Sequence, residues 1–288
     1  MDSRTIGNVK VSAMGLGGMP MSVEGRPDED RSLRTIHQAL DLGITLIDTA
    51  DAYCLGAHEV GHNERLIAKG LATWSGDASE VLVATKGGHT RDADEEDGDD
   101  WGLNGRPEYL KRACEASLKA LGVEAIGLYQ FHRPDPDVPY AESVGAFKDL
   151  QDEGKVRMVG LSNATIEQIE ESRRIVDIAS VQNEFSPRFR SSEDELEFCA
   201  REGIAFLPWS PLGGMGSAAD LGSEHSAFAE VADAHGVSPQ QVAIAWELAK
   251  AEAVLPIPGS SRPETIADSA KAVELELAPE ELRKLDAG

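Results

Sequence analysis

The chain is poor in cysteine, in aromatic side chains and in positive charge, and it contains no long apolar run. Its three cysteines, Cys54, Cys114 and Cys199, are widely spaced. An odd and scattered set fits neither a disulfide framework nor a zinc ribbon, so we expect free thiols. No stretch approaches the roughly 18 apolar residues of a membrane-spanning helix, and residues 1–10 lack the pattern of a signal peptide. We therefore expect a cytoplasmic protein that does not enter a membrane.

Basic residues are outnumbered, because 27 Lys and Arg stand against 51 Asp and Glu and give a net charge of −24. Such a charge repels nucleic acid and anionic membrane surfaces and favours solubility. Neither is expected as a partner, and the acidity is also compatible with an origin in high salt. Part of it lies in residues 91–100, RDADEEDGDD, which we interpret as a solvated loop without a partner.

Short apolar, β-prone runs alternate along the chain with segments of helical period. The expected strands cover residues 14–17, 45–49, 81–86, 126–132, 156–162, 178–183, 204–209 and 253–257. The expected helices follow at residues 28–42, 64–73, 107–121, 141–153, 165–175, 194–201, 239–250 and 263–272. Eight such pairs predict an α/β fold with one domain over residues 1–288, a (β/α)8 or TIM barrel, because eight parallel strands close a barrel.

Several segments lie outside this repeat. Residues 5–11 place Gly7-Asn8 between two β-prone pairs, which predicts an N-terminal β-hairpin at the bottom of the barrel. Residues 89–105 and 211–225 predict long loops at the C-terminal face, where loops of this length are usually functional. A helix is expected at residues 227–235, and residues 279–285 predict a closing C-terminal helix.

Three of the expected strands end on polar side chains. The stretch LIDTADAY ends a strand on Asp48 and brings Tyr53 five residues later, VLVATK ends on Lys86, and IGLYQFH ends on His132. The C-terminal ends of parallel strands open onto one face of a barrel, where a polar residue is typical of a catalytic site. We therefore expect these four side chains to form one site.

This combination suits reduction of a carbonyl group by hydride. The carbonyl oxygen needs a proton, which a tyrosine can supply at neutral pH if its pKa, about 10 when free, is lowered. Lys86 would lower the pKa of Tyr53, and Asp48 would keep Lys86 charged and in place. His132 would bond to and orient the carbonyl oxygen. Taken singly, each has a structural alternative: a cap of the following turn for Asp48, a surface cation for Lys86 and a core position for His132.

Two further motifs have the wrong context. Residues 58–62, HEVGH, match the H-E-x-x-H zinc signature, but glycines flank and interrupt it and helical signals begin only at Asn63-Glu64. Residues 15–20, GLGGMP, begin like a dinucleotide fingerprint, but proline stands where the third glycine belongs and no helix follows. We expect neither a metal site nor a Rossmann site here.

From end to end the chain resembles the aldo-keto reductases. The segments that carry this resemblance are LIDTADAY, GHNERLIAKGL, VLVATKGG, EASLKALGV, LYQFHRPDP, GKVRMVGLSN, VQNEFSP, LPWSPLGG and IPGSSRPETI, in the family's order. The resemblance implies an NAD(P)H-dependent oxidoreductase that reduces an aldehyde or ketone to the alcohol. It also implies a catalytic tetrad of Asp48, Tyr53, Lys86 and His132, with Tyr53 as the general acid.

The resemblance further implies an extended NADPH bound without a Rossmann domain. Ser162, Asn163 and Gln182 match the residues that hold the nicotinamide carboxamide, and Trp209 matches an aromatic residue stacked on the nicotinamide ring. The other positions that match cofactor contacts are Gly17, Gly18, Met19, Ser210, Pro211, Leu212, Gly259, Ser260, Ser261 and Arg262. The last four precede the helix expected from residue 263, whose free amides and dipole favour a phosphate.

The last of these segments departs from the family pattern. Many members carry a lysine, a second arginine and an asparagine where this chain has Gly259, Thr265 and Ser269. Arg262 is therefore the guanidinium left in that segment for a 2′-phosphate. Because an arginine is the usual reader of this group, we expect NADPH rather than NADH.

Other functions stay open from the sequence. The chain could be an NAD(P)-dependent sugar or alcohol dehydrogenase working in oxidation, with Tyr53 as a phenolate base. It could be a cofactor-binding interaction module with little turnover, like the family's channel-associated β subunits, or a zinc hydrolase. The small-molecule carbonyl substrate should depend on the loops at residues 54–62, 89–105 and 211–225, with Met21, Trp101 and Phe131 as pocket candidates. The oligomeric state is not indicated.

Overall fold

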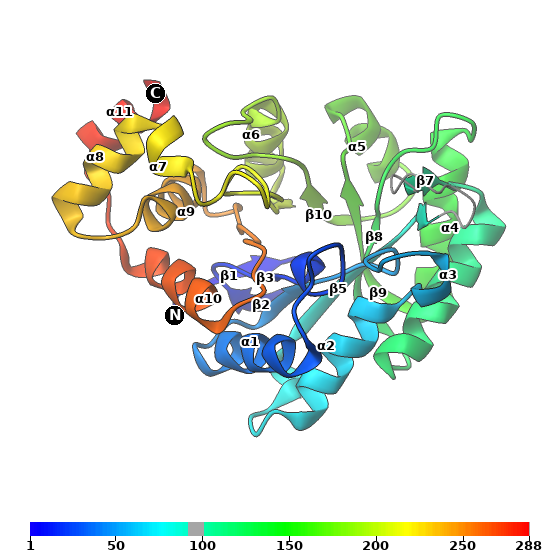
Figure 1. Cartoon of the computed structure of the whole chain (residues 1–288). Coiled ribbons are helices and arrows are strands. Elements are labelled where there is room, and N and C mark those ends of the chain that lie inside the picture. The colour runs from blue at the N-terminus through cyan, green and yellow to red at the C-terminus, as the bar shows by residue number, and fades with distance from the viewer. Residues whose placement is uncertain (92–100, 288) are drawn as a thin grey trace.

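Seven parallel strands form a curled sheet in the order β11–β10–β9–β8–β5–β4–β3 (Figure 1). The computed structural model describes residues 1–91 and 101–287. The strands are β3 (Leu16–Gly17), β4 (Leu46–Asp48), β5 (Leu82–Gly87), β8 (Ile126–Phe131), β9 (Val156–Ser162), β10 (Ile178–Gln182) and β11 (Ala205–Phe206). Residues 254–259 join the two edges of this sheet through parallel bridges from Phe206 to Val254 and from Gly17 to Gly259. The sheet is thereby closed into the expected (β/α)8 barrel.

The eighth segment of the barrel is held more sparsely than the others. The amides of Leu255 and Ile257 donate to β11 and to Pro208, while Pro256 and Pro258 only accept, from Gly15 and Gly17. A proline has no amide hydrogen, so within residues 254–258 the hydrogen bonds toward β3 are only accepted, and the first amide that donates to β3 is that of Ser260, to the Gly17 carbonyl oxygen at 3.4 Å. The strands expected at residues 204–209 and 253–257 are for this reason reduced to two residues and to isolated bridges.

Helices surround the barrel as an outer ring (Figure 1). They are α1 (Glu29–Asp41), α2 (His62–Thr73), α3 (Pro107–Leu121), α4 (Tyr140–Asp152), α5 (Ile166–Arg173), α6 (Glu193–Glu202), α9 (Pro239–Lys250) and α10 (Pro263–Ala270). Their ends carry the signals read from the sequence, because Asp28 caps α1 through the amide of Arg31 and Gly122 ends α3 in the left-handed region. Within the described residues, no helix combines the length and the apolar character needed to cross a membrane.

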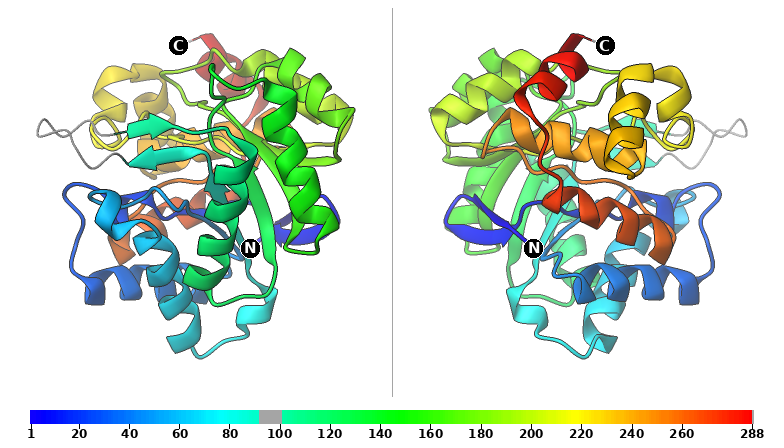
Figure 2. Two further views of the ribbon diagram at one scale, coloured as in Figure 1. Left: turned by 90° about the vertical axis from the view of Figure 1, so that its right-hand side faces the viewer. Right: turned by 90° about the vertical axis from the view of Figure 1, so that its left-hand side faces the viewer.

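Two antiparallel hairpins lie at opposite ends of the barrel (Figure 2). The N-terminal hairpin pairs β1 (Ser3–Ile6) with β2 (Val9–Ser12), and its Ile6 and Val11 pack on the apolar bottom of the barrel. The second pairs β6 (His89–Arg91) with β7 (Trp101–Leu103). The loop expected at residues 89–105 is thus a hairpin in its described part. Residues 92–100, most of the acidic run, lie outside the described residues.

The C-terminal part of the chain adds three helices, α7 (Leu221–Glu224), α8 (Ser226–His235) and α11 (Pro279–Ala287). The expected closing helix α11 packs against α8 and buries Leu285. Asp286 accepts hydrogen bonds from Trp246 and Lys250 of α9, and Arg190 donates to the carbonyl oxygens of Leu285 and Asp286. These contacts fix α11 to the outside of the barrel.

The interior of the barrel changes character from bottom to top. An apolar cluster that includes Leu46, Leu82, Leu128 and Met158 fills its lower part, where the strands begin. Above it, toward the C-terminal ends of the same strands, the buried side chains are polar or charged. The polar end is the face on which a barrel of this kind carries its site.

Candidate active site

Lys86 joins Asp48 and Tyr53 at the C-terminal ends of β4 and β5. Its Nζ lies 2.6 Å from Asp48 Oδ2, 3.0 Å from the Tyr53 hydroxyl and 2.9 Å from the Thr49 carbonyl oxygen, so all three ammonium hydrogens have acceptors. The His132 ring stands edge-on to the Tyr53 ring, with 5.7 Å between the ring centroids. The structure therefore brings together the four side chains that the strand ends predict.

The backbone places Tyr53 over Lys86 through a tight turn. After β4, the amide of Thr49 donates to Ala84 of β5, and the amide of Asp51 donates to the Lys86 carbonyl oxygen. The Tyr53 amide then donates to Ala50, which turns the chain back toward the barrel axis. The four residues between Asp48 and Tyr53 thus give the length that the phenol needs to reach the ammonium group of the neighbouring strand.

Two glutamines hold Asp48 from the opposite side. Gln182 of β10 donates to Asp48 Oδ1 at 2.7 Å, and Gln130 of β8 donates to the same oxygen at 3.3 Å. The sequence reasoning missed Gln130, although a buried amide two residues before His132 in an apolar strand is a visible signal. The carboxylate is therefore oriented by a hydrogen-bond network that spans four strands.

Burial changes the acidity of this cluster in a way that the sequence did not predict. Burial raises the pKa of Tyr53 above its ordinary value of 10.0, and Lys86 opposes this rise without overcoming it. The expected lowering of the Tyr53 pKa is wrong, because desolvation of the phenolate outweighs the nearby ammonium group. For Lys86, burial lowers the pKa, but Asp48 and Tyr53 together raise it above its ordinary value. The pair is thus a neutral phenol beside a charged ammonium.

Both histidines near Tyr53 are neutral. Burial, followed by the charge of Lys86, takes the pKa of His132 well below its ordinary value. Burial together with Arg133, Arg91 and Lys86 lowers the pKa of His89 to about 4. A neutral imidazole keeps one N–H donor, which suits the expected hydrogen bond from His132 to a carbonyl oxygen.

A cavity of about 330 Å³ opens above these side chains. Asp48, Tyr53 and His132 line it, together with most of the positions that match cofactor contacts. These are Gly17, Met19, Ser162, Asn163, Gln182, Trp209, Ser210, Pro211, Leu212 and Gly259. The tetrad and the expected nicotinamide wall therefore share one cavity.

Two residues of this wall have strained backbones. Asn163 has a φ of 55° and Ser210 a φ of 51°, in a region that favours glycine, and no other non-glycine residue among those described has a positive φ. Asn163 is fixed by donating to the His132 carbonyl oxygen and by accepting from the indole nitrogen of Trp209. Strain of this kind concentrates at functional sites.

Four of the expected cofactor residues lie away from the cavity lining. Gly18 is buried and donates its amide to the Asp48 carbonyl oxygen, so it supports the site from behind. The Ser260 hydroxyl bonds to the Arg262 carbonyl oxygen and to Thr265. Ser261 and the exposed Arg262 precede α10, and no side chain in the described parts of the chain pairs with the Arg262 guanidinium.

The cavity also contains residues that sequence reasoning did not assign. They are Pro20, His89, Arg133, Gly214, Met215, Ala218 and Ile257. Of the three pocket candidates, Trp101 lines the cavity, whereas Met21 and Phe131 are buried in the core. Arg133 follows His132 directly and His89 follows the two glycines after Lys86, so both could have been found as polar residues next to expected strand ends.

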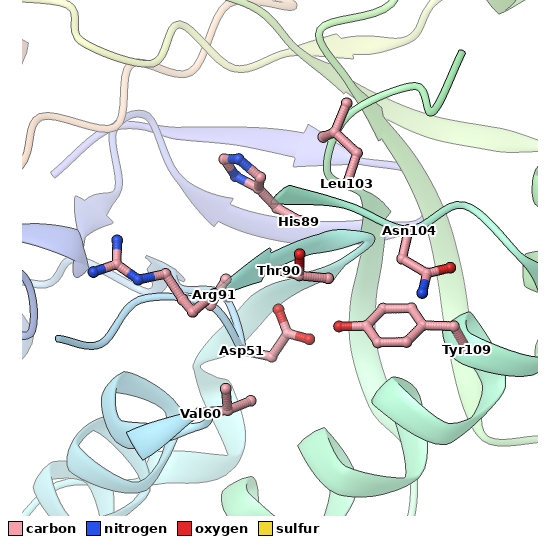
Figure 3. Close-up of a pocket in the computed structure, with 9 residues that line it drawn as sticks. Asp51, Val60, His89, Thr90, Arg91, Leu103, Asn104 and Tyr109 are labelled. Atoms are coloured by element: carbon pink, nitrogen blue, oxygen red, sulfur yellow. The ribbon is translucent and has the colours of Figure 1, made fainter. Parts of the chain in front are cut away.

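A second hollow of about 430 Å³ lies beside this cavity (Figure 3). It is lined by Asp51, Ala52, Val60, His89, Thr90, Arg91, Leu103, Asn104 and Tyr109, so His89 borders both spaces. The Asp51 carboxyl group and the Tyr109 phenol point toward one another in this hollow (Figure 3). Burial and the nearby Glu64 raise the pKa of Asp51 well above its ordinary value, which favours the protonated form of this carboxyl group.

The H-E-x-x-H residues are engaged in other contacts. Glu59 forms an ion pair with Arg26 at 2.7 Å, and His62 Nδ1 lies 2.8 Å from the Ser22 hydroxyl. A 3-10 turn at Ala57–Glu59 precedes α2, and Gly61 separates the two in a left-handed conformation. His58 and His62 therefore do not share one face of a helix, as a zinc-protease signature requires.

Known proteins resemble this chain over its whole length. The family model described as Aldo/keto reductase family matches residues 13–287. The chain belongs to this family. It is therefore an NAD(P)H-dependent oxidoreductase that acts on carbonyl and alcohol groups.

Two relatives support the assignment. The chain is 35% identical over 285 residues to an uncharacterized oxidoreductase of Schizosaccharomyces pombe. This alignment covers 98% of this chain and 88% of the relative. It is 33% identical over 304 residues to "Probable aldo-keto reductase 1" of Glycine max, covering 96% and 85%.

Solved structures of other aldo-keto reductases superpose closely on this one. The glycerol dehydrogenase of Gluconobacter oxydans matches with a TM-score of 0.85 at 26% identity, covering 99% of this chain and 94% of that one. An aldo-keto reductase of Klebsiella pneumoniae in complex with NADPH matches with a TM-score of 0.81 at 27% identity, covering 100% and 95%.

Proposed function

We propose that this aldo-keto reductase reduces a small aldehyde or ketone to its alcohol with NADPH, and that Tyr53 is the general acid. The observation that carries the proposal is the buried chain of contacts from Asp48 through Lys86 to Tyr53, next to the neutral His132. A protonated phenol beside a fixed ammonium group can give up its proton when negative charge develops on a substrate oxygen.

The residues around the cavity fit a nicotinamide cofactor. The half-exposed indole of Trp209 offers a flat surface, and the Ser162 hydroxyl and the Asn163 amide offer polar groups beside it. When bound, the cofactor supplies the hydride for reduction of the carbonyl carbon. In the proposed reaction the Tyr53 hydroxyl protonates the carbonyl oxygen, Lys86 stabilises the resulting phenolate, and a neutral N–H of His132 orients the substrate oxygen.

The raised pKa of Tyr53 favours the protonated phenol, which is the form that reduction requires. Because burial raises its pKa, Tyr53 stays protonated through the neutral range and can act as an acid there. Oxidation of an alcohol needs the phenolate instead. We expect kcat for reduction to be nearly constant across neutral pH and to fall at alkaline pH, while alcohol oxidation rises with pH. A rate of alcohol oxidation that is highest below neutral pH would favour another base.

NADPH is the proposed cofactor for two reasons. The Klebsiella pneumoniae relative is described in complex with NADPH. Arg262 is exposed beside the start of α10, and its guanidinium has no acidic partner within the described residues. An exposed arginine without an acidic partner is able to pair with a 2′-phosphate, which NADPH has and NADH lacks.

The test is a turnover assay with purified protein, both cofactors and a panel of small aldehydes, ketones and alcohols. Consumption of NADPH with an aldehyde, faster than with NADH, supports the proposal. Tight binding of NADPH in a fluorescence titration without turnover of any carbonyl would instead support a cofactor-binding interaction module. Turnover only of alcohols, at every pH tested, would support a dehydrogenase working in oxidation.

We further propose that residues 1–288 form one domain and that the protein works in the cytoplasm with a small-molecule substrate. The ring of strands from β3 to residues 254–259 includes both early and late parts of the chain, which supports one domain. Cys54, Cys114 and Cys199 are all free and buried, which supports a reducing compartment.

A further inference from the structure

Arg133 places a positive charge inside the candidate active-site cavity. It follows His132 directly after β8, lines the cavity, and its guanidinium carbon lies 5.9 Å from the centroid of the Trp209 ring. Its charge also acts on Tyr53, His89 and His132, whose pKa values it helps to lower. The guanidinium is therefore close to the place where a carbonyl substrate must sit.

Three acidic side chains around Arg133 do not form an ion pair with it. Asp48 pairs with Lys86, and both carboxylate oxygens of Asp135 accept backbone amides, from Gly105 and from Asp137. Glu184 senses the charge of Arg133, which lowers its pKa against the larger effect of burial, but no ion pair within 4 Å joins the two. Among the described residues, Arg133 has no hydrogen-bonded acidic partner.

The surroundings of Arg133 leave its charge uncompensated within the cavity. The lowered pKa values of His89 and His132 keep both imidazoles neutral, and burial raises the pKa of Asp51 in the neighbouring hollow well above its ordinary value. This local excess of positive charge occurs in a chain whose net charge is −24. A half-buried guanidinium without a carboxylate partner is suited to a ligand that brings an oxyanion, because the planar fork bonds carboxylate and phosphate through two parallel hydrogen bonds.

We propose that Arg133 binds an oxyanion carried by the substrate, so that the enzyme prefers carbonyl compounds with a carboxylate or phosphate group over uncharged ones. This inference rests on the proposed reductase function and names the class of substrate for the same site. With the carbonyl oxygen at Tyr53 and His132, the anionic group lies on the side of the cavity where Arg133 stacks over Trp209. Arg133 is then a specificity-determining residue, and the chemistry stays with Tyr53.

The test compares pairs of substrates that share the same aldehyde, of which one carries an oxyanion and the other is uncharged. 4-Carboxybenzaldehyde and its neutral methyl ester have the same aromatic aldehyde, and glyceraldehyde 3-phosphate and glyceraldehyde form the corresponding phosphate pair. For wild type we expect the anionic member of at least one pair to have the higher kcat/KM. In Arg133→Met the ratio of anionic to neutral kcat/KM should fall by about 10- to 100-fold, the range for a lost charge-assisted hydrogen bond. Comparison of the two pairs separates carboxylate from phosphate.

Three further measurements make the outcome decisive. Arg133→Lys should keep part of the preference, since it retains the charge and loses the fork. Arg157→Met removes an equal charge from the exposed start of β9, at the opposite end of the barrel, and should leave the ratio unchanged. Raising the salt concentration should lower the ratio in wild type but not in Arg133→Met. If Arg133→Met does not fold, as judged by circular dichroism, Arg133→Lys and the salt dependence carry the test.

Several results would overturn the assignment. An unchanged ratio in Arg133→Met would show that Arg133 does not read substrate charge. Equal losses for both members of a pair, accompanied by weaker NADPH binding in a fluorescence titration, would assign Arg133 to the cofactor. If wild type turns over no carbonyl compound with NADPH, the proposed function itself fails. If it turns over neutral and anionic aldehydes alike, the function stands and only the role of Arg133 fails.

Discussion

Residues 46–132 and residues 162–262 both contribute to the rim of the barrel, but different contacts hold them. In the first region, side chains are bonded to side chains, since Lys86 joins Asp48 to Tyr53 and Gln130 donates to Asp48. Gln182 of the second region adds one more side-chain hydrogen bond to Asp48. In the second region, Ser210 to Leu212 and Gly259 to Arg262 are placed mainly by backbone contacts, short strands and isolated bridges.

The difference separates two tasks. A proton donor must be held at one distance from its neighbours, and a buried side-chain network does this with little freedom. A long cofactor must enter and leave, and a wall built from backbone and half-exposed side chains can accept it without first breaking internal ion pairs. We infer that substitutions in the first region change turnover and folding stability, whereas those in the second change cofactor binding.

Tyr53→Phe is the strongest test of the first region. It removes the proton donor and keeps the ring, so kcat for carbonyl reduction should fall by about 10²- to 10⁴-fold while the Kd for NADPH stays nearly constant. Steady-state kinetics and a fluorescence titration measure the two quantities. Tyr140→Phe removes a phenol from α4, outside the cavity, and should leave both unchanged. Retention of wild-type kcat by Tyr53→Phe would mean that another acid operates.

Lys86→Met should also lower folding stability, because it leaves the buried Asp48 carboxylate without its ion pair. Loss of one partner of a buried pair costs about 3–5 kcal/mol in the free energy of unfolding. Adding Asp48→Asn in the same chain should restore most of this free energy without restoring turnover. Urea denaturation of the single and double variants measures the effect. A single variant as stable as wild type would show that the pair does not support the fold.

Arg262→Ala tests the second region through binding. If the guanidinium pairs with the 2′-phosphate, the variant should bind NADPH about 1.5–3 kcal/mol more weakly and NADH almost as before. Salt should narrow the wild-type preference, because screening weakens only the extra phosphate contact. Arg283→Ala, at an exposed position of α11, is the control for loss of one charge. Equal losses for both cofactors would make Arg262 a structural residue.

Glu247 of α9 gives the smallest expected effect and contrasts with Asp48. It is fully buried, and neither carboxylate oxygen has a hydrogen-bond partner within the described residues. Burial raises its pKa well above the ordinary value, so the folded state holds a proton that the unfolded state releases above about pH 4.3. The contribution of this raised pKa to the free energy of unfolding is complete below that pH. It is lost as the pH rises through the pKa of Glu247 in the folded state.

Glu247→Leu removes the free-energy cost of keeping the buried Glu247 carboxyl group protonated at a pH where the unfolded chain releases this proton. The variant should be about 1–3 kcal/mol more stable than wild type at pH 8, with a smaller gain at pH 5. Urea denaturation at both pH values measures the difference. Glu197→Leu, at an exposed position of α6, should show no such dependence on pH. A gain that is equal at the two pH values would mean that the titration of Glu247 is not its source.

Much of the fold was predictable because local signals agree with the packing. Proline at the start and Gly122 at the end bound α3 at the residues expected, and β9 also has its expected limits. The grouping of Asp48, Lys86 and His132 followed from one geometrical rule, that equivalent strand ends meet. These signals act over a few residues or repeat along the chain, so a single sequence contains them.

Other features depend on contacts between distant segments. The Gln182 amide donates to Asp48 and to Gln130, which lie on two other strands, and no local pattern reveals these partners. The sign of the Tyr53 pKa shift depends on how much water the surrounding segments exclude. The β6–β7 hairpin was not predicted because each of its strands is only three residues long and the acidic run separates them in the sequence.

The bridge between Gly17 and Gly259 also has a consequence for the order of folding. It makes the first strand of the barrel the neighbour of its last strand segment, more than 200 residues later in the sequence, and a Cβ on Gly17 would lie only 2.8 Å from the Ile257 carbonyl oxygen. Contacts so distant in sequence form slowly, because a long loop must first be ordered. Until residues 254–259 pack against it, β3 is an open edge of the sheet. Closure of the barrel is therefore expected to be a late step in folding, after the strands between β3 and residues 254–259 have paired.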